Sequence, residues 1–145
     1  MTHDHIFVYG TLLTSAEHDM GRRLRDGASL VGRGSIQARL YIIDDPDMPG
    51  QNRYPGALPS PLPADHVHGE LYRMHDPADL LPAFDAYEAC SPDWDEPHEF
   101  LRRTVEVSLE DGALVTALCY FYSWDVSTAT HVASGRFTEI APEVR

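Results

Sequence analysis

Val8-Tyr9-Gly10-Thr11-Leu12, near the start of the chain, and Phe84-Asp85-Ala86-Tyr87-Glu88, in its middle, are the stretches that decide the fold and point to a chemistry. The first is typical of a short strand that runs into a glycine turn, and the second of a short helix that carries carboxylates at its end. Backbone N–H groups in such a turn can hold an oxyanion, and a positioned carboxylate can move a proton. Together the two stretches supply what acyl-group chemistry needs.

The composition indicates one acidic domain spanning residues 1–145. With 43% hydrophobic residues the chain can bury an ordinary core, and its formal net charge is −12. All 11 basic residues are arginine, and they form no basic run. Nucleic acid and an anionic membrane surface are therefore poor partners.

Targeting and redox signals are weak at the level of sequence. The segment Met1-Thr2-His3-Asp4-His5 lacks the basic start of a signal peptide, and Gly10 interrupts the apolar run that follows. No stretch is long enough to span a bilayer. Cys90 and Cys119 do not form a disulfide framework. We expect a soluble, cytoplasmic protein.

The first half of the chain predicts strands around one weak helix. A strand is expected at 6–9 and a helix at 15–25, followed by one extended run over 30–43. Glycines at 32 and 34 in that run indicate a bulge or a sharp bend. The Pro-, Gly- and Asp-rich stretch from Asp44 to Pro63 is expected to be a long loop.

The second half predicts a strand at 67–74, a helix and a hairpin. The helix begins with Asp76 as N-cap and Pro77 at its first position, and it continues to Glu88. Alternating apolar runs at 100–109 and 113–122 flank Glu110-Asp111-Gly112, which is a hairpin signal. The order β, α, β, β, α, β, β predicts an α+β domain around a curved or closed mixed sheet.

Glu88 is the first candidate for a catalytic group. It ends the predicted helix, where the macrodipole disfavours a negative charge, and Asp85 lies three residues earlier on the same face. Both effects raise the pKa of a carboxyl group, which suits a general base that must return its proton. The alternative is a solvated acidic helix end without a catalytic role.

The turn that follows the first strand also has two interpretations. Gly10 either permits only a tight turn or lets a substrate approach the backbone while neighbouring N–H groups point at it. Tyr120 and Tyr122 share a strand face, and either one is a candidate for substrate contact.

Other chemistries have weaker signals. His3 with His5 and His66 with His68 have a spacing compatible with a metal, but no third ligand follows at a telling distance, so no metal is expected. Cys90 lacks the surroundings of a cysteine hydrolase, and Cys119 is expected in the core. The chain has no P-loop and no dinucleotide fingerprint.

Five segments, taken in order, resemble the gamma-glutamylcyclotransferase-like family, in particular its gamma-glutamylamine cyclotransferase and AIG2-like branch. The resemblance covers about residues 5–123 of the chain. The segments are Phe7-Val8-Tyr9-Gly10-Thr11-Leu12, Tyr54-Pro55-Gly56-Ala57-Leu58, Val67-His68-Gly69-Glu70-Leu71-Tyr72, Leu81 to Glu88, and the pair Phe100-Leu101-Arg102-Arg103 and Ala117 to Tyr122.

The resemblance implies a small mixed β-barrel with flanking helices and one active-site cavity. It implies that the α-amine of a γ-glutamyl group attacks its own γ-carbonyl, forming 5-oxoproline and releasing an amine, without metal or cofactor. Glu88 would be the general acid/base. The backbone N–H groups of Tyr9, Gly10, Thr11 and Leu12 would hold the substrate carboxylate and the oxyanion.

Two other functions stay open at this point. A non-catalytic module could bind a γ-glutamyl or amino-acid ligand in the same cavity, and a relative could open the γ-glutamyl amide with water instead. The acidic segments Asp44 to Pro63 and Cys90 to Glu99 favour a cationic leaving amine. The substrate, the pathway and the oligomeric state are not fixed by the sequence.

Overall fold

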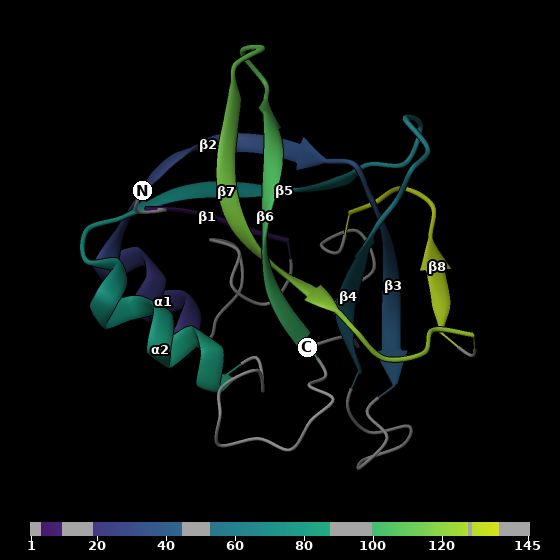
Figure 1. Ribbon diagram of the computed structural model, residues 1–145, viewed down its shortest axis with the longest axis horizontal. Coiled ribbons are helices and arrows are strands. Elements are labelled where there is room, and N and C mark those ends of the chain that lie inside the picture. The colour runs from purple at the N-terminus through teal and green to yellow at the C-terminus, as the bar shows by residue number, and fades with distance from the viewer. Residues whose placement is uncertain (1–3, 10–18, 45–52, 88–99, 128, 137–145) are drawn as a thin grey trace.

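The computed structural model of the chain describes residues 4–9, 19–44, 53–87, 100–127 and 129–136. Five strands close a barrel, and three more form a small second sheet beside it (Figure 1). The barrel order is β1 (His5–Val8), β5 (Val67–Met74), β2 (Ala28–Ile36), β6 (Phe100–Leu109) and β7 (Leu114–Tyr122); the second sheet has the order β4 (Arg53–Pro59), β3 (Ala38–Asp44) and β8 (Thr130–Val132).

The barrel is mixed because of a single parallel pairing. All of its neighbouring strands are antiparallel except β1 and β7, which close the barrel side by side in the same direction. Two helices, α1 (Asp19–Gly27) and α2 (Pro77–Tyr87), lie next to each other on one side of it (Figure 1). The expected α+β fold, a small mixed β-barrel with flanking helices, is confirmed.

Helix α2 forms where its sequence signals predict it. The carbonyl of Asp76 accepts hydrogen bonds from the N–H groups of Asp79 and Leu80, both at 3.1 Å, and Pro77 is the first residue of the helix. Leu80 and Phe84 are fully buried, so one face of the helix packs on the barrel. Pro82 lies inside the helix on its exposed side.

Helix α1 is confirmed in part, since residues 15–18 of the predicted helix lie outside the described residues. Leu24, which belongs to the predicted apolar face, is fully buried. Neither helix in the described part of the chain is long and apolar enough to cross a membrane.

The predicted hairpin is confirmed as β6 and β7. The turn between them contains Gly112 with a φ of 93°, and the N–H of Gly112 donates to the carbonyl of Leu109 at 2.9 Å. The carboxylate of Asp111 accepts a hydrogen bond from the N–H of Ala113 at 2.9 Å. Asp-Gly therefore closes this turn for the reason expected of it: glycine adopts the positive φ without a side-chain clash.

The expected single strand at 30–43 is wrong. The chain bends at Gln37, so that β2 joins the barrel and β3 joins the second sheet. The expected bulge is confirmed, because the register of β2 against β5 shifts between Leu30 and Gly32. The bulge therefore lies beside the glycines that predicted it. In contrast, β2 ends at a position that no glycine or proline marks in the sequence.

The expected long loop from Asp44 to Pro63 is also wrong, because it contains β4. Pro55 and Gly56 are typical of turns, yet both lie in this strand. Strand β4 is an edge strand bonded only to β3 within its sheet, where a missing N–H is tolerated. An added Cβ on Gly56 would lie 2.9 Å from the Cβ of Tyr122, so glycine lets β4 approach β7.

Two buried clusters divide the core. The first, here called the helix-side core, joins the barrel to the helices and includes Val8, Tyr72, Phe84 and Tyr120. The second contains Phe7, Tyr9, Leu71 and other residues of the barrel together with Ala57 and Leu40 of the second sheet. Successive residues of β1 and β5 alternate between the two clusters, as strand geometry requires.

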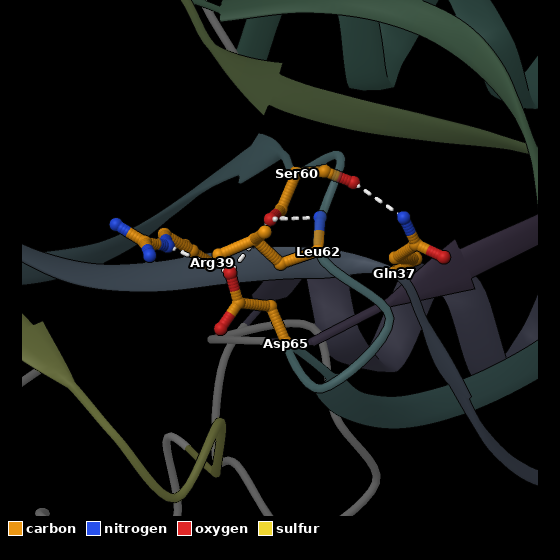
Figure 2. A network of polar contacts seen from close by, with 5 residues as sticks. All are labelled: Gln37, Arg39, Ser60, Leu62 and Asp65. Atoms are coloured by element: carbon orange, nitrogen blue, oxygen red, sulfur yellow. Dashed lines mark hydrogen bonds and ion pairs between the residues drawn. The ribbon is translucent and has the colours of Figure 1, made fainter.

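A polar network fastens the connection between β4 and β5 (Figure 2). The carboxylate Oδ2 of Asp65 accepts hydrogen bonds from the Ser60 hydroxyl at 2.6 Å and from Arg39 Nε at 2.7 Å. The Ser60 carbonyl accepts from the side-chain amide of Gln37 at 2.7 Å, and the Ser60 hydroxyl accepts from the N–H of Leu62 at 3.1 Å. The hydrogen bond from Ser60, followed by that from Arg39, holds the pKa of Asp65 below its usual value.

We expect Gly56→Ala to lower the free energy of unfolding by about 1–3 kcal/mol, the usual cost of overpacking. The new methyl group would have to displace Tyr122 or Ile43, both of which are buried. Urea denaturation followed by circular dichroism measures the effect. Gly32→Ala is the matched control, because its Cβ meets nothing closer than 4.0 Å. Equal losses in both variants would contradict this account of the β4–β7 contact.

We expect Asp65→Asn to reduce stability at pH 7. We also expect the stability of this variant to decrease less than that of the wild type as the pH falls. Because the folded pKa of Asp65 is lowered, its contribution is complete above the unfolded value of about 3.9 and is lost as the pH falls through the lower folded pKa. Thermal unfolding between pH 7 and pH 2 measures this. The exposed carboxylate of Asp79 gives the control variant Asp79→Asn. An acid profile of Asp65→Asn that parallels the wild type would refute the prediction.

Candidate active site

The end of β1 is held by the side chain of Tyr9. This tyrosine is 7% exposed, and its hydroxyl donates to the carbonyl of Tyr120 at 2.7 Å and accepts from the N–H of Ala57 at 3.1 Å. The end of β1 is thereby tied to β7 and to β4. Of the predicted cradle, Tyr9 is in the described part; Gly10, Thr11 and Leu12 lie outside it, and their role stays a prediction.

The end of α2 is held by Asp85. Its carboxylate accepts a hydrogen bond from the Tyr120 hydroxyl at 2.6 Å and two from Nη1 of Arg102, at 2.9 and 2.8 Å. The side chains of Asp85 and Arg102 are only 23% and 34% exposed. Glu88 follows directly after the last residue of α2 and lies outside the described residues, so its predicted role is untested.

The ion pair changes one expectation. The sequence predicts that the negative charge of Asp85 raises the pKa of the Glu88 carboxyl group. Arg102 compensates the charge of Asp85, which weakens that repulsion. Asp85 instead anchors the last turn of the helix to β6 and β7.

Tyr120 connects the two predicted halves of the site. Its carbonyl accepts the hydrogen bond of Tyr9, and its own hydroxyl binds Asp85. The residue thus links the strand end that precedes Gly10 to the helix end that precedes Glu88. Tyr122, the other candidate, is buried and packs edge-on against Phe100, with ring centroids 5.4 Å apart.

A second carboxylate lies on the same face of the barrel. Glu70 is 8% exposed, and its Oε1 accepts a hydrogen bond from the Tyr72 hydroxyl at 2.9 Å. In the antiparallel pairing of β1 and β5, Glu70 stands opposite Val8, so their side chains point to the same side. Val8 and Tyr72 both belong to the helix-side core.

The described residues give little support to the other chemistries considered from the sequence. Across those ranges, no group of three or more His, Cys, Asp or Glu side chains is arranged to hold a metal ion. The rings of His66 and His68 lie 6.5 Å apart. Cys119 is buried in the core, as predicted, and Cys90 lies outside the described residues.

Sequence reasoning did not assign a role to Arg102 or to Glu70. The signal for Arg102 was present: strand alternation puts it on the face of Phe100, and the hairpin register puts it opposite Tyr120. Glu70 shares its strand face with His68 and Tyr72, so nothing in the alternation pattern distinguishes it from an exposed carboxylate. A strand end, an anchored helix end and a buried carboxylate make up the described part of the site.

Comparison with known proteins identifies the fold and its relatives. The sequence matches the family described as gamma-glutamyl cyclotransferase, AIG2-like, over residues 6–139. An AIG2-like protein from Mus musculus has a similar structure, with 25% identity and a TM-score of 0.65, over 88% of this chain and 82% of that one. No curated protein sequence matches significantly.

Two further solved structures share the fold at lower identity. A gamma-glutamyl cyclotransferase is 17% identical with a TM-score of 0.62, over 84% of this chain and 68% of that one. YkqA from Bacillus subtilis is 18% identical with a TM-score of 0.65; the match covers 95% of this chain and 40% of that longer protein.

We expect Tyr120→Phe to lower the free energy of unfolding by about 1–2 kcal/mol, since it removes one hydrogen bond to a partly buried carboxylate. Urea denaturation measures the loss. The control is the same substitution in an Asp85→Ala background, where the carboxylate is already gone and the loss should become small. An equal loss in both backgrounds would show that the bond between Tyr120 and Asp85 does not stabilise the end of α2.

Proposed function

This chain belongs to the gamma-glutamyl cyclotransferase, AIG2-like family, and we propose that it cyclises a γ-glutamyl amine or amide to 5-oxoproline with release of the free amine. Family membership supports a cyclotransferase-type enzyme in broad terms. The substrate, the product and the residues that act on them are the proposal.

In the proposed reaction the substrate supplies its own nucleophile. The α-amine nitrogen forms a bond to the γ-carbon, and the bond from that carbon to the leaving nitrogen breaks. The α-ammonium loses two protons as it becomes the lactam N–H, and the leaving nitrogen gains two and departs as an ammonium ion. Glu88 takes up these protons one at a time and passes them to the leaving nitrogen. The backbone N–H groups of Tyr9, Gly10, Thr11 and Leu12 hold the α-carboxylate and the developing oxyanion. No cofactor takes part in these steps.

The observation that carries the proposal is the double link through Tyr120. The strand that leads into Gly10 and the helix that leads into Glu88 are fastened to this one residue by hydrogen bonds of 2.7 and 2.6 Å. The reaction is intramolecular, so its rate depends on holding the γ-glutamyl group in a reactive geometry. Fixed ends of β1 and α2 support a site whose two halves keep a constant separation.

The two alternatives differ from the proposal in their product. A binding module with the same fold releases nothing, and a hydrolytic relative releases glutamate. Both alternatives would use the same residues as the proposed reaction. An assay of the product is therefore needed to distinguish cyclisation, hydrolysis and binding without turnover.

We expect purified protein to release 5-oxoproline from some members of a panel of γ-glutamyl amines and dipeptides. Glu88→Gln should lower the rate by at least about 100-fold, the usual contribution of a general acid/base. Product formation is followed by chromatography with separate detection of glutamate. Asp79→Asn, which neutralises an exposed carboxylate of the same helix, is the control and should keep full activity.

The other outcomes assign the function differently. Release that survives Glu88→Gln would move the proton carrier elsewhere, and glutamate as the product would favour hydrolysis. No release from any substrate would favour the binding module. The panel includes neutral and cationic leaving amines, and equal turnover of both would contradict the expected preference for a cationic amine.

A further inference from the structure

A cleft of about 280 Å³, here called the β4 cleft, lies between the edge strand β4 and the β6–β7 hairpin. Its lining residues all belong to the described part of the chain, and no step of the proposed reaction uses it. Apolar side chains form most of its walls: Leu58 and Pro59 of β4, Leu101 of β6 and Phe121 of β7. Its volume is close to the lower end of the range of about 300–1,000 Å³ that is typical of small-molecule sites.

The β4 cleft lies on the face of the hairpin opposite to the ion pair at the end of α2. Side chains alternate along a strand, so Leu101 and Arg103 point to one side of β6 and Arg102 points to the other. Arg102 binds Asp85, whereas Arg103 lines the cleft. The two neighbouring arginines therefore serve different faces of the same strand.

Arg103 supplies a positive charge to the cleft, and the hydroxyl of Ser123 supplies a second hydrogen-bond donor. Both residues are exposed. Within the described ranges the guanidinium of Arg103 makes no ion pair and no hydrogen bond, whereas Arg39 and Arg102 each bind an aspartate. In a chain with a net charge of −12, an arginine without an acidic partner beside apolar walls is a local site for an anion.

The outer edge of β4 argues against a peptide strand as the occupant of the cleft. The N–H of Ala57 points away from β3, because it donates to the Tyr9 hydroxyl. Pro55 and Pro59 lie two residues to either side and share this orientation in the pairing with β3, but proline has no N–H. Between residues 55 and 59 this edge therefore offers an added strand no N–H donor. A ligand in the cleft has to be held by side chains.

We propose that the β4 cleft binds a small monocarboxylate with an apolar body, a role that does not depend on the proposed function. The planar guanidinium of Arg103 matches a carboxylate with two parallel hydrogen bonds, and the Ser123 hydroxyl donates a third. The apolar walls cover the rest of the ligand. A carboxylate is favoured over a phosphate because one cation compensates one negative charge, and the overall field of the acidic chain repels the excess.

The test is a titration of the ¹⁵N-labelled protein with phenylacetate, phenylacetamide and acetate, followed by NMR. Phenylacetamide has the ring but no charge, and acetate has the charge but no ring. We expect phenylacetate to bind at least about tenfold more tightly than either, because only phenylacetate combines charged hydrogen bonds with apolar burial. Saturable shifts of the amide signals of Leu58, Arg103 and Ser123 would locate the ligand in the cleft.

Variants of Arg103 test the role of the guanidinium. Arg103→Gln should bring the affinity ratio of phenylacetate to phenylacetamide close to one. Arg103→Lys keeps the charge but loses the planar pair of donors, so its ratio should lie between those of Arg103→Gln and the wild type. The matched control is Arg23→Gln, which removes an exposed arginine from α1 on the side of the barrel away from β4 (Figure 1) and should bind like the wild type.

Three outcomes would overturn the proposal: a preference for phenylacetate that survives Arg103→Gln, equal binding of phenylacetamide by the wild type, and shifts that do not saturate or that lie away from the cleft. The comparison of the three ligands in the wild type decides the matter even where a variant does not fold. The 5-oxoproline assay is a separate measurement, so the proposed function and the β4 cleft fail independently.

Discussion

The hydrogen bond from the Tyr9 hydroxyl to the Tyr120 carbonyl is the interaction on which the arrangement of the site depends. It lies where β1 closes the barrel against β7, next to a parallel pairing that has a single matched residue pair, Ile6 with Leu118. So short a parallel pairing contributes few main-chain bonds. The buried side-chain bond from Tyr9, just beyond the last residue of β1, therefore fixes this end of the strand against β7.

The second constraint is the close approach of neighbouring backbones. It explains why glycine is required at two positions in the segments that resemble the family. A Cβ on Gly69 would clash with the carbonyl oxygen of Val8 and would lie 2.8 Å from the ring of Phe7. Gly56 plays the same part between β4 and β7. Both glycines act through packing, since neither has a positive φ. They bring β4 and β5 close to the end of β1, where Tyr9 binds Ala57 and Glu70 faces Val8.

The sequence predicts those parts of the fold whose signals are local. Asp76 with Pro77 marked the start of α2, and Asp111 with Gly112 marked the hairpin. Strand β4 was missed because Pro55 and Gly56 were interpreted by their turn preference, whereas an edge position and a close contact with β7 override that preference. The pairing of Arg102 with Tyr120 follows from the hairpin register, but the approach of Asp85 to both depends on how α2 packs, which no local pattern encodes.

The site of this acidic chain combines fixed charges of both signs on one face. Arg102 neutralises Asp85, so that carboxylate anchors the helix rather than attracting a ligand cation. Glu70 accepts a hydrogen bond from the Tyr72 hydroxyl in a buried position. The bonds of Asp85 join α2 to both strands of the β6–β7 hairpin, and this is what sets the position of the helix end relative to the barrel.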